Sequence, residues 1–566
     1  MQSLLQRSPS SNIAKVEPRR THKQHTPVAN HVAVVRRSLQ AACQAPAALA
    51  STVELVQQRV HHQPEQQFQQ NSIVAFSTHR RLEEPEQQPA VPLFVSLCDE
   101  LCAACYRQPE AARGGLKALQ RLGVWGVVVN IWWGQVESAP QQYDWAQYQA
   151  LFRVAQEVGL RVKVSFCFHG DDKHTLPAWV LEEGKQCPDM FFTDRAGCRN
   201  TECLSVGVDH VPALAGRTAL QAYTDFMAAF RDAFSELLGS VVTDADIGLG
   251  PRGEFRYPST PLDSRWNFPG IGEFQCYDRF MVASLSAAAQ QVGQPHWGNS
   301  GPHDAGSYCQ WPHQTGFFHH QGSWDSEYGR FFLQWYSSLL LLHADQLLGR
   351  ARQTLGDAGV RLHAKLPTIH WWYNQAAHAA ELTAGLYNTG SRSGYLAFCQ
   401  VLSRHRVGLV LTGGEMRDCE QPSYALASPE ALLLQLRATA ASQQVRVTLG
   451  NLSTRFDQAA LSELERKSFE PACYRGIDLE HVDALCFGSM SESMFEETQN
   501  WLGFKDWAGR MREHNAALAA ERQLRSRRPL AARGKQQQQQ EQPPPQQQQQ
   551  QVAAEQQQEE RQSALV

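Results

Sequence analysis

Short apolar runs recur along the middle of the chain, and segments with helical spacing separate them. Between residues 93 and 515, each run is followed by a loop with glycine or aromatic side chains and then by a helical pattern, as in Leu116–Leu122 and Tyr148–Glu157. The predicted strands are Leu93–Leu97, Gly126–Asn130, Val162–Phe166, Ala245–Ile247, Leu362–Leu366, Val407–Leu411, Val445–Leu449 and Ala484–Phe487.

Strands that alternate with helices predict a parallel sheet, because parallel neighbours need a crossover connection. About eight such units over this length match the count and size of a (β/α)8 TIM barrel with long loops. The alternative is an open doubly wound sheet, which normally carries a glycine-rich phosphate-binding turn after its first strand. The segment after Leu97 has no such turn. The sequence therefore predicts the barrel over residues 93–515.

The two ends of the chain differ in composition from this region. Residues 1–53 hold one acidic residue, Glu17, among scattered Arg, Lys, Ser and Thr. This composition resembles a plastid transit peptide, with a disordered basic tail as the alternative. Residues 54–92 read as a Gln-rich linker, and residues 516–566 as a low-complexity Gln-rich tail that begins with a helical pattern, Leu518–Arg528. Such polar segments cannot bury a core, so we expect disordered extensions, with self-association through the tail as a lesser alternative.

Charge and cysteine content bear on the kinds of partner. The formal net charge of -4 gives no electrostatic case for nucleic acid, and no apolar run reaches the length of a membrane span. The 14 cysteines are scattered, as in a reducing compartment, and their one cluster is Cys98, Cys102 and Cys105. A zinc site needs a second ligand pair, and none is obvious downstream, so we expect no metal and no cofactor. A redox-sensitive pair and ordinary free thiols both stay open for this cluster.

One stretch, Gly248–Ser259, combines a constrained backbone with a carboxylate. It follows a predicted strand and contains three glycines and two prolines, which fix a special backbone path. Glu254 lies at its centre, with Arg252, Arg256 and Tyr257 close by in the sequence. Such a carboxylate is a candidate acid or base. A surface Glu in a cluster with two Arg is the alternative.

Other distinctive side chains also follow predicted strands, where a (β/α)8 barrel places its active site. Aromatic pairs beside amides, His and Lys are typical of a sugar site, because flat rings cover sugar C–H faces and polar groups bind the hydroxyls. A core Trp pair with a satisfied His is the alternative for any single motif. The candidates, in chain order, are Asn130, His169, Lys365, His370, Thr412 and Asn451.

Taken together, the motifs of this region resemble those of the β-amylases, the inverting glycoside hydrolases that release maltose from non-reducing ends of α-1,4-glucans. The resemblance implies an α-1,4-glucan or malto-oligosaccharide as ligand and Glu254 as the general acid, which protonates the departing oxygen. The matching segments are Trp132–Gly134, Gly248–Ser259, Phe268–Asp278, Ile369–Tyr373, His378–Gly385 and Glu415–Ser423. The positions that the resemblance assigns to substrate binding are Asn130, His169, Lys365, His370, Thr412, Asn451 and Leu452.

The general base is where the chain departs from the family pattern. The family has a Glu before an Asn in the segment after the seventh strand, and an alignment without gaps puts Gly450 at that position. Asn451 and Arg455 match the family and anchor the register. An inverting pair stands about 6.5–9.5 Å apart so that the base can activate a water. Glycine has no side chain and cannot take that proton.

Three further departures affect the same region. The family's mobile lid is represented by the shorter segment Ser165–Pro177, Asn130 stands in place of an Asp, and Phe487–Ser489 replaces a Tyr-Leu-Arg. A positioned base contributes on the order of 10²–10⁴ in rate. Misplacement of reacting groups alone costs about 10². The sequence therefore predicts little or no maltose release.

Three functions stay open at this point. The first is an impaired or inactive β-amylase-like protein of the chloroplast stroma, which binds a glucan or regulates starch breakdown through protein partners. The second is an active β-amylase with an unusual base, for which Glu415 and Asp418 are candidates, although Glu415 belongs to the ordinary family motif. The third is an interaction protein that uses its Gln-rich ends and leaves the barrel empty.

Overall fold

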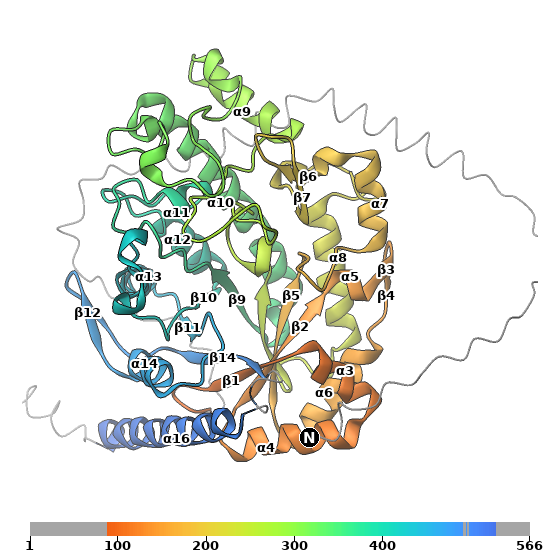
Figure 1. The fold of residues 1–566 in the computed structure, drawn as a ribbon. Helices are drawn as coiled ribbons and strands as arrows, with labels where there is room; N and C mark the ends of the chain where they lie inside the picture. The colour runs from red at the N-terminus through yellow and green to blue at the C-terminus, as the bar shows by residue number, and fades with distance from the viewer. Residues whose placement is uncertain (1–87, 491–493, 495–496, 528–566) are drawn as a thin grey trace, which may run out of the picture. The chain divides into compact units, whose positions relative to one another are not determined.

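The chain forms a closed barrel of eight parallel strands surrounded by helices (Figure 1). The computed structural model describes residues 88–490, 494 and 497–527. The proposed transit peptide, most of the Gln-rich linker and most of the Gln-rich tail lie outside the described residues. In order around the barrel the strands are β1 (Leu93–Leu97), β14 (Ala484–Met490), β11 (Val447–Gly450), β10 (Gly408–Leu411), β9 (Arg361–Leu366), β8 (Val242–Ile247), β5 (Arg161–Cys167) and β2 (Gly126–Trp132).

The predicted (β/α)8 barrel is confirmed, and each of the eight predicted strands overlaps an observed one. Both faces of these strands are covered, one by the barrel interior and one by helices, so the strands read as nearly continuous apolar runs. In β2, for example, Val127 and Val129 are fully buried and Val128 is almost so. Because every strand pair is parallel, the carboxyl ends of all eight strands meet at one end of the barrel.

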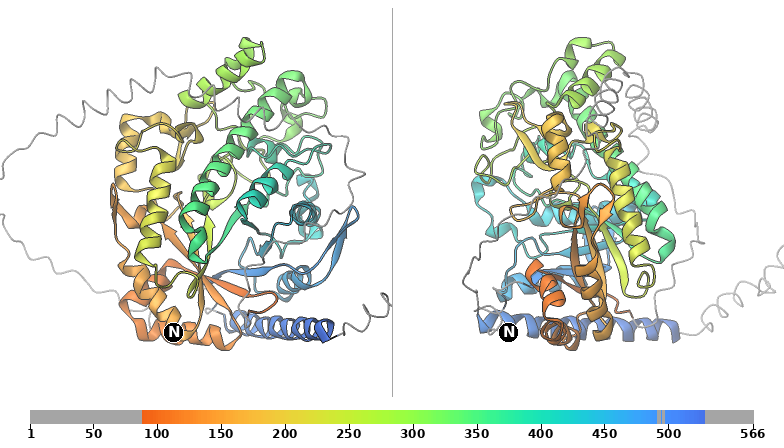
Figure 2. Two further views of the ribbon diagram at one scale, coloured as in Figure 1. Left: turned by 180° about the vertical axis from the view of Figure 1, so that it is seen from behind. Right: turned by 90° about the vertical axis from the view of Figure 1, so that its right-hand side faces the viewer.

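Helices cover the outside of the barrel and connect its strands (Figures 1 and 2). The predicted helical patterns Leu116–Leu122 and Tyr148–Glu157 fall in α4 and α6. The helices are α3 (Asp99–Arg107), α4 (Pro109–Arg121), α5 (Trp133–Val136), α6 (Ala146–Val158), α7 (Ala178–Gln186), α8 (Ala219–Ala233), α9 (Arg279–Gln291), α10 (Glu327–Leu355), α11 (Ala379–Thr383), α12 (Leu396–His405), α13 (Pro429–Ser442), α14 (Gln458–Phe469) and α16 (Thr498–Arg527).

Short two-stranded sheets lie outside the barrel, and the longest connection runs from β8 to β9. That connection carries the Glu254 loop, α9 and the 29-residue helix α10. The small sheets pair β3 (Glu137–Ala139) with β4 (Gln142–Tyr143), β6 (Phe191–Thr193) with β7 (Arg199–Leu204), and β12 (Ala472–Tyr474) with β13 (Ile477–Leu479). By its internal contacts the chain divides into Met1–Arg512 and Glu513–Val566, and the barrel belongs to the first unit. Residues 518–527 of the predicted helix Leu518–Arg528 form the C-terminal part of α16 rather than a separate element, and Arg528 lies outside the described residues.

Charged side chains as well as apolar ones are buried with the barrel strands. Lys163 Nζ lies 2.9 Å from Asp246 Oδ1, and both residues are buried. Burial alone would lower the pKa of Lys163, but the neighbouring groups together, led by the Asp246 carboxylate and including Asp244, outweigh burial and raise that pKa. Asp244 accepts from Arg361 and lies 2.8 Å from His363 Nε2. Burial would raise the pKa of Asp244, and these two neighbours outweigh it, so the pKa lies well below its usual range. The buried carboxylates are therefore paired.

The cysteine cluster that the sequence singled out lies at α3. Cys102 and Cys105 are buried, and Cys98 is half-buried just before the helix. Burial raises the pKa of all three thiols, that of Cys105 to about 11. Thiols with such pKa values hold little thiolate at neutral pH, so the structure favours ordinary buried cysteines over a reactive pair. Among the described residues, no group of His, Cys, Asp and Glu could hold a metal ion, and no helix is long and apolar enough to cross a membrane.

Candidate functional site

The loop after β8 holds its carboxylate on a tightly packed backbone. A side chain at Gly248 would place its Cβ 2.4 Å from the Phe166 carbonyl oxygen, and one at Gly250 would lie 2.5 Å from that of Arg256. Both positions therefore require glycine because neighbouring backbone comes so close. Arg252, with φ 57°, then turns the chain toward Glu254. The glycines of this loop thus allow the close backbone contacts that fix the path of the chain before Glu254.

Glu254 is a buried carboxylate at this end of the barrel, 7% exposed. Its Oε2 accepts from Arg256 Nε at 2.7 Å, and Arg256 is buried as well. The Glu254 backbone forms an isolated parallel bridge with Lys365 at the end of β9, and Phe255 N donates to the Lys365 carbonyl at 2.8 Å. Phe255 stacks on Phe398 of α12 with a centroid distance of 3.9 Å. The surface-Glu alternative is wrong, because the carboxylate is buried beside another candidate residue.

His169 belongs to the same group. Burial, reinforced by the positive charge of Lys365, lowers the pKa of His169 to about 3, so its imidazole is neutral. A Cβ at Gly253 would lie 3.6 Å from His169 Cε1, which places this ring directly against the Glu254 loop. Its Nδ1 is buried and has no hydrogen-bond partner among the described residues. Lys365 Nζ donates to the Arg252 carbonyl at 3.4 Å.

His370 and Thr412 are linked through Thr368. The Thr368 hydroxyl donates to the Thr412 carbonyl at 2.7 Å and lies 3.0 Å from the Thr412 hydroxyl. His370 Nδ1 lies 3.1 Å from the Thr368 carbonyl oxygen, and its Nε2 lies 3.2 Å from Gln421 Oε1. Burial lowers the pKa of His370. These contacts join the loops after β9 and β10, as the parallel arrangement predicts.

The end of β11 brings Gly450, Asn451 and Leu452 to the same edge. The Asn451 amide is used within the protein, because its Nδ2 donates to the Ser453 carbonyl at 2.9 Å and its Oδ1 accepts from Gly488 N at 2.5 Å. Leu452 is 45% exposed. Asn451 therefore ties the loop after β11 to β14, which limits the hydrogen bonds that it can offer to a ligand.

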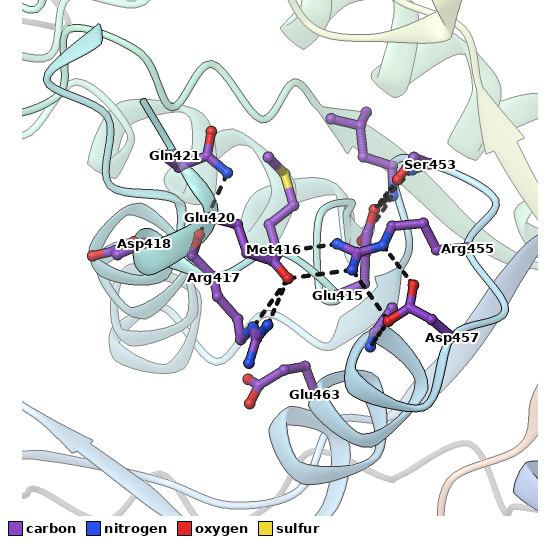
Figure 3. Close-up of polar contacts among 12 residues, drawn as sticks. Glu415, Met416, Arg417, Asp418, Glu420, Gln421, Ser453, Arg455, Asp457 and Glu463 are labelled. Atoms are coloured by element: carbon purple, nitrogen blue, oxygen red, sulfur yellow. Dashed lines mark hydrogen bonds and ion pairs between the residues drawn. The ribbon is translucent and has the colours of Figure 1, made fainter. Parts of the chain in front are cut away.

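Glu415 holds this loop from the side of β10 (Figure 3). Its carboxylate is buried and accepts from Leu452 N at 3.1 Å, from Ser453 N at 2.8 Å and from the Ser453 hydroxyl at 2.9 Å. Asp418, the other candidate for a substitute base, accepts from the Ser428 hydroxyl at 2.6 Å and from Glu430 N at 3.0 Å, at the start of α13. Both carboxylates are engaged in holding backbone.

Arg455 joins the same two loops at the surface (Figure 3). Its guanidinium donates to Glu420 at 2.9 and 3.2 Å and to Asp457 at 2.8 and 3.2 Å. Glu420 also accepts from Arg417, and these hydrogen bonds, led by those from Arg455, lower its pKa to about 2. The loops after β10 and β11 are thus joined both by the buried Glu415 and by this surface cluster.

The segment after β5 is closed on itself. Asp171 Oδ1 accepts from Lys173 N at 2.8 Å and from His174 N at 2.7 Å. The His174 ring stacks on Trp132 at a centroid distance of 3.9 Å and lies 3.4 Å from Asp99 Oδ2, while Trp132 Nε1 donates to Asp99 Oδ1 at 3.1 Å. This segment is a compact turn against β2 and α3.

Asn130 lies within β2 rather than on a loop after a strand. It is half-buried and pairs in register with Ser165 of β5. The contacts above therefore form two separate groups of candidates. One contains Glu254, His169 and Lys365, and the other contains His370 and Thr412. Gly450, Asn451 and Leu452 join the second group through Glu415 and through the bond from Gly414 N to the Gly450 carbonyl.

Comparison with known proteins places this arrangement in a family. The profile described as Glycosyl hydrolase family 14 matches residues 99–513. The chain belongs to this family, the β-amylases. Beta-amylase 1, chloroplastic, from Arabidopsis thaliana is 43% identical over 390 residues, which cover 67% of this chain and 68% of that protein. Beta-amylase 2, chloroplastic, from Oryza sativa subsp. japonica is 42% identical over 414 residues, with 71% and 73% covered.

A solved structure supports the fold of this β-amylase-family chain. The catalytic domain of beta-amylase from Paenibacillus polymyxa aligns with a TM-score of 0.59 at 23% identity and covers 75% of this chain and 99% of that domain. The resemblance read from the motifs is thereby confirmed at the level of the family and the barrel.

Sequence reasoning about this β-amylase-family site missed the structural use of Glu415. Its four hydrogen bonds come from residues 37 and 38 positions farther along the chain. The only sequence signal for it was its place in a motif after a predicted strand. Ser453, Thr368 and Gln421 were missed as well, because their roles depend on which loops become neighbours.

Proposed function

We propose that this β-amylase-family protein binds an α-1,4-glucan at the carboxyl end of its barrel and releases maltose very slowly or not at all. The observation that carries the proposal is Gly450 at the end of β11, where the family's pattern calls for the general base. An inverting hydrolase needs one carboxylic acid to protonate the departing oxygen and one carboxylate to take a proton from the attacking water. Glu254, whose carboxylate is paired with Arg256, stands at the position that the resemblance assigns to the first role, and Gly450 cannot perform the second.

The substitute bases are poorly suited to the task. Glu415 accepts four hydrogen bonds from the loop after β11. Asp418 is exposed and accepts two at the start of α13. Releasing either one to activate water would break contacts that hold the loops.

Binding without turnover is supported by the candidates that remain. Lys365 lies at the end of β9, beside Glu254, and His370 and Thr412 lie on the loops after β9 and β10. Their mixture of neutral imidazole, ammonium and hydroxyl groups suits sugar hydroxyls. Asn130 and Leu452 extend the proposed site along β2 and past β11. We infer a glucan-binding or regulatory role in starch breakdown, with protein partners as further ligands, and no metal or cofactor has a part in it.

We also propose a plastid location, in the stroma. The Arabidopsis and Oryza relatives are named chloroplastic. The acid-poor composition of residues 1–53 agrees with a transit peptide. Fusion of residues 1–92 to a fluorescent protein tests this, and a cytosolic signal would contradict it.

The competing function is an active β-amylase, which the 43% identity to proteins of that name favours. Purified protein incubated with soluble starch separates the two, with maltose as the measured product. Calorimetric titration with maltotriose tests binding independently of turnover. We expect maltotriose binding that Lys365→Ala weakens, and no maltose above a protein-free control. Rapid maltose release that Glu254→Gln abolishes would contradict the proposal.

A further inference from the structure

Two aromatic rings from distant segments lie parallel at the surface. The Trp311 and Tyr424 ring planes differ by 5°, and their centroids are 5.6 Å apart. Tyr424 is 53% exposed and Trp311 is half-buried. We call these two residues the outer ring pair. The two rings are stacked on each other, and the exposed outer face of such a stack is suited to packing against a flat partner.

The outer ring pair is held firmly from below. Tyr424 lies in a turn, Ser423–Ala425, whose Ala425 carbonyl accepts from Trp372 N at 2.8 Å. Trp311 precedes the turn Pro312–Gln314, and its N–H donates to Gln314 Oε1 at 2.8 Å. The Trp311 ring also packs on Trp372 at a centroid distance of 5.6 Å. Because both turns are already held in place, binding a ligand to these rings costs little conformational entropy of the protein.

The outer ring pair is continuous with the proposed glucan site. Trp372 belongs to the same loop as His370, and the turn that carries Tyr424 begins two residues after Gln421, whose side chain contacts His370. On the other side of that loop, Phe268 is 40% exposed and lies 6.0 Å from the His370 ring. Rings therefore extend outward from His370 to Tyr424.

The surroundings of the outer ring pair favour a neutral, hydroxyl-rich partner. Residues 310–315 and 421–428 contain no Asp, Glu, Lys or Arg. Their exposed polar side chains, with that of the neighbouring Asn374, are imidazole, amide and hydroxyl groups: His313, Gln314, Asn374 and Ser423. A protein interface of ordinary stability buries about 1,200–2,000 Å², far more than two side chains supply. Two rings with neutral donors and acceptors match a sugar chain better.

We propose that the outer ring pair is a second glucan-binding position, on which a longer α-1,4-glucan packs after leaving the barrel site. The inference rests on the proposed function, since it extends the same ligand outward. Short oligosaccharides occupy the barrel site alone, whereas a polymer contacts both. The outer ring pair should therefore matter for long glucans and not for short ones.

Two measurements on the full chain test this. Native gel electrophoresis with amylopectin in the gel measures retention by a long glucan, and calorimetric titration with maltotriose measures the barrel site. The variants are Trp311→Ala, Tyr424→Ala and the double substitution. The matched control is Tyr106→Ala, which removes an equally exposed ring, 59% exposed, from α3. Equal melting temperatures show that each variant is folded.

We expect the double substitution to weaken amylopectin retention about tenfold or more, as the loss of two aromatic contacts implies. Maltotriose affinity should stay within about twofold, and Tyr106→Ala should change neither. Unchanged retention of the double variant would overturn the inference and leave the barrel site intact. A double variant with unchanged amylopectin retention and a changed oligomeric state in gel filtration would also overturn the inference, because the outer ring pair would then be a contact between copies of the chain. Retention that depends on the pair without maltotriose binding would support the pair and contradict the proposed barrel site.

Discussion

A Cβ at Gly450 would lie 3.0 Å from the Cys486 carbonyl oxygen, with no other heavy atom closer than 3.7 Å. The backbone of Gly450 is outside the left-handed region, so its conformation does not require glycine, but a Cβ there requires the Cys486 carbonyl of β14 to shift by a few tenths of an ångström. The backbone conformation at this position therefore does not explain why the residue is glycine. Its lack of a carboxylate is a chemical difference that can be reversed by mutation.

We expect Gly450→Glu to restore maltose release only weakly, by less than about tenfold. The new carboxylate is placed beside an Asn451 whose amide is already bonded within the protein, and the segment after β5 stays a closed turn. Initial rates of maltose release from soluble starch measure the effect. Gly450→Ala is the matched control, since it adds the same Cβ without the carboxylate. Restoration by a factor of about 10³ would show that the base alone was missing.

His169 makes the stability of the fold depend on pH. Its pKa is about 3 in the folded chain against an ordinary value of 6.5. Between these two pH values the His169 imidazole is protonated in the unfolded chain and neutral in the folded chain. The free energy of unfolding therefore falls as the pH decreases, by up to about 1.4 kcal/mol per pH unit. We expect His169→Gln to reduce this slope in urea unfolding between pH 7 and pH 5. His303→Gln, at an exposed histidine, is the control and should leave the slope unchanged. An unchanged slope in His169→Gln would contradict the burial of the His169 imidazole.

Among the elements, the loop after β11 depends on a side chain from another loop. Glu415→Ala leaves the N–H groups of Leu452 and Ser453 without their acceptor, so we expect a loss of about 2–3 kcal/mol in unfolding free energy. Amide hydrogen exchange at these two residues should accelerate. Glu420→Ala, which removes a more exposed carboxylate from the same loop, should cost less than about 1 kcal/mol. Equal losses in the two variants would contradict the structural role of Glu415.

The segment after β5 is expected to stay fixed when ligand binds. Its turn is closed by Asp171, and the ring of His174 is stacked on Trp132. A mobile lid would gain protection on closing, whereas a closed turn has little to gain. We predict unchanged amide exchange at Lys173 and His174 on addition of saturating maltotriose. Protection that rises tenfold or more would show that the shorter segment still closes over the ligand.

The strands were predictable because their apolar runs are continuous and repeat at regular intervals. Val127, Val129, Val162 and Val164 are fully buried, and such runs have no other place in a soluble fold. The positions of Glu254, Lys365 and His370 followed from the rule that loops after strands meet at one end. The contacts of Glu415 and Asp99 did not follow, because each joins segments distant in sequence. Likewise, nothing in the local pattern paired Lys163 with Asp246.

In the whole molecule, the barrel gathers the loops that follow its eight strands at one end. The family and the barrel follow from the sequence match and the fold together. The chemistry depends on a small set of positions within that frame. If Glu254 and Gly450 stand at the acid and base positions as we propose, the chain should hold a glucan without cleaving it.

The rate of maltose release from soluble starch, measured side by side for the unmodified protein and Glu254→Gln, tests this account most directly. If the base is missing, the unmodified protein releases almost no maltose, and removing the acid cannot lower that rate further. We therefore predict equal rates for the two proteins, both at the level of a protein-free control. A rate for the unmodified protein that exceeds that of Glu254→Gln by about 10² or more would contradict the account, because a complete acid–base pair would then be at work.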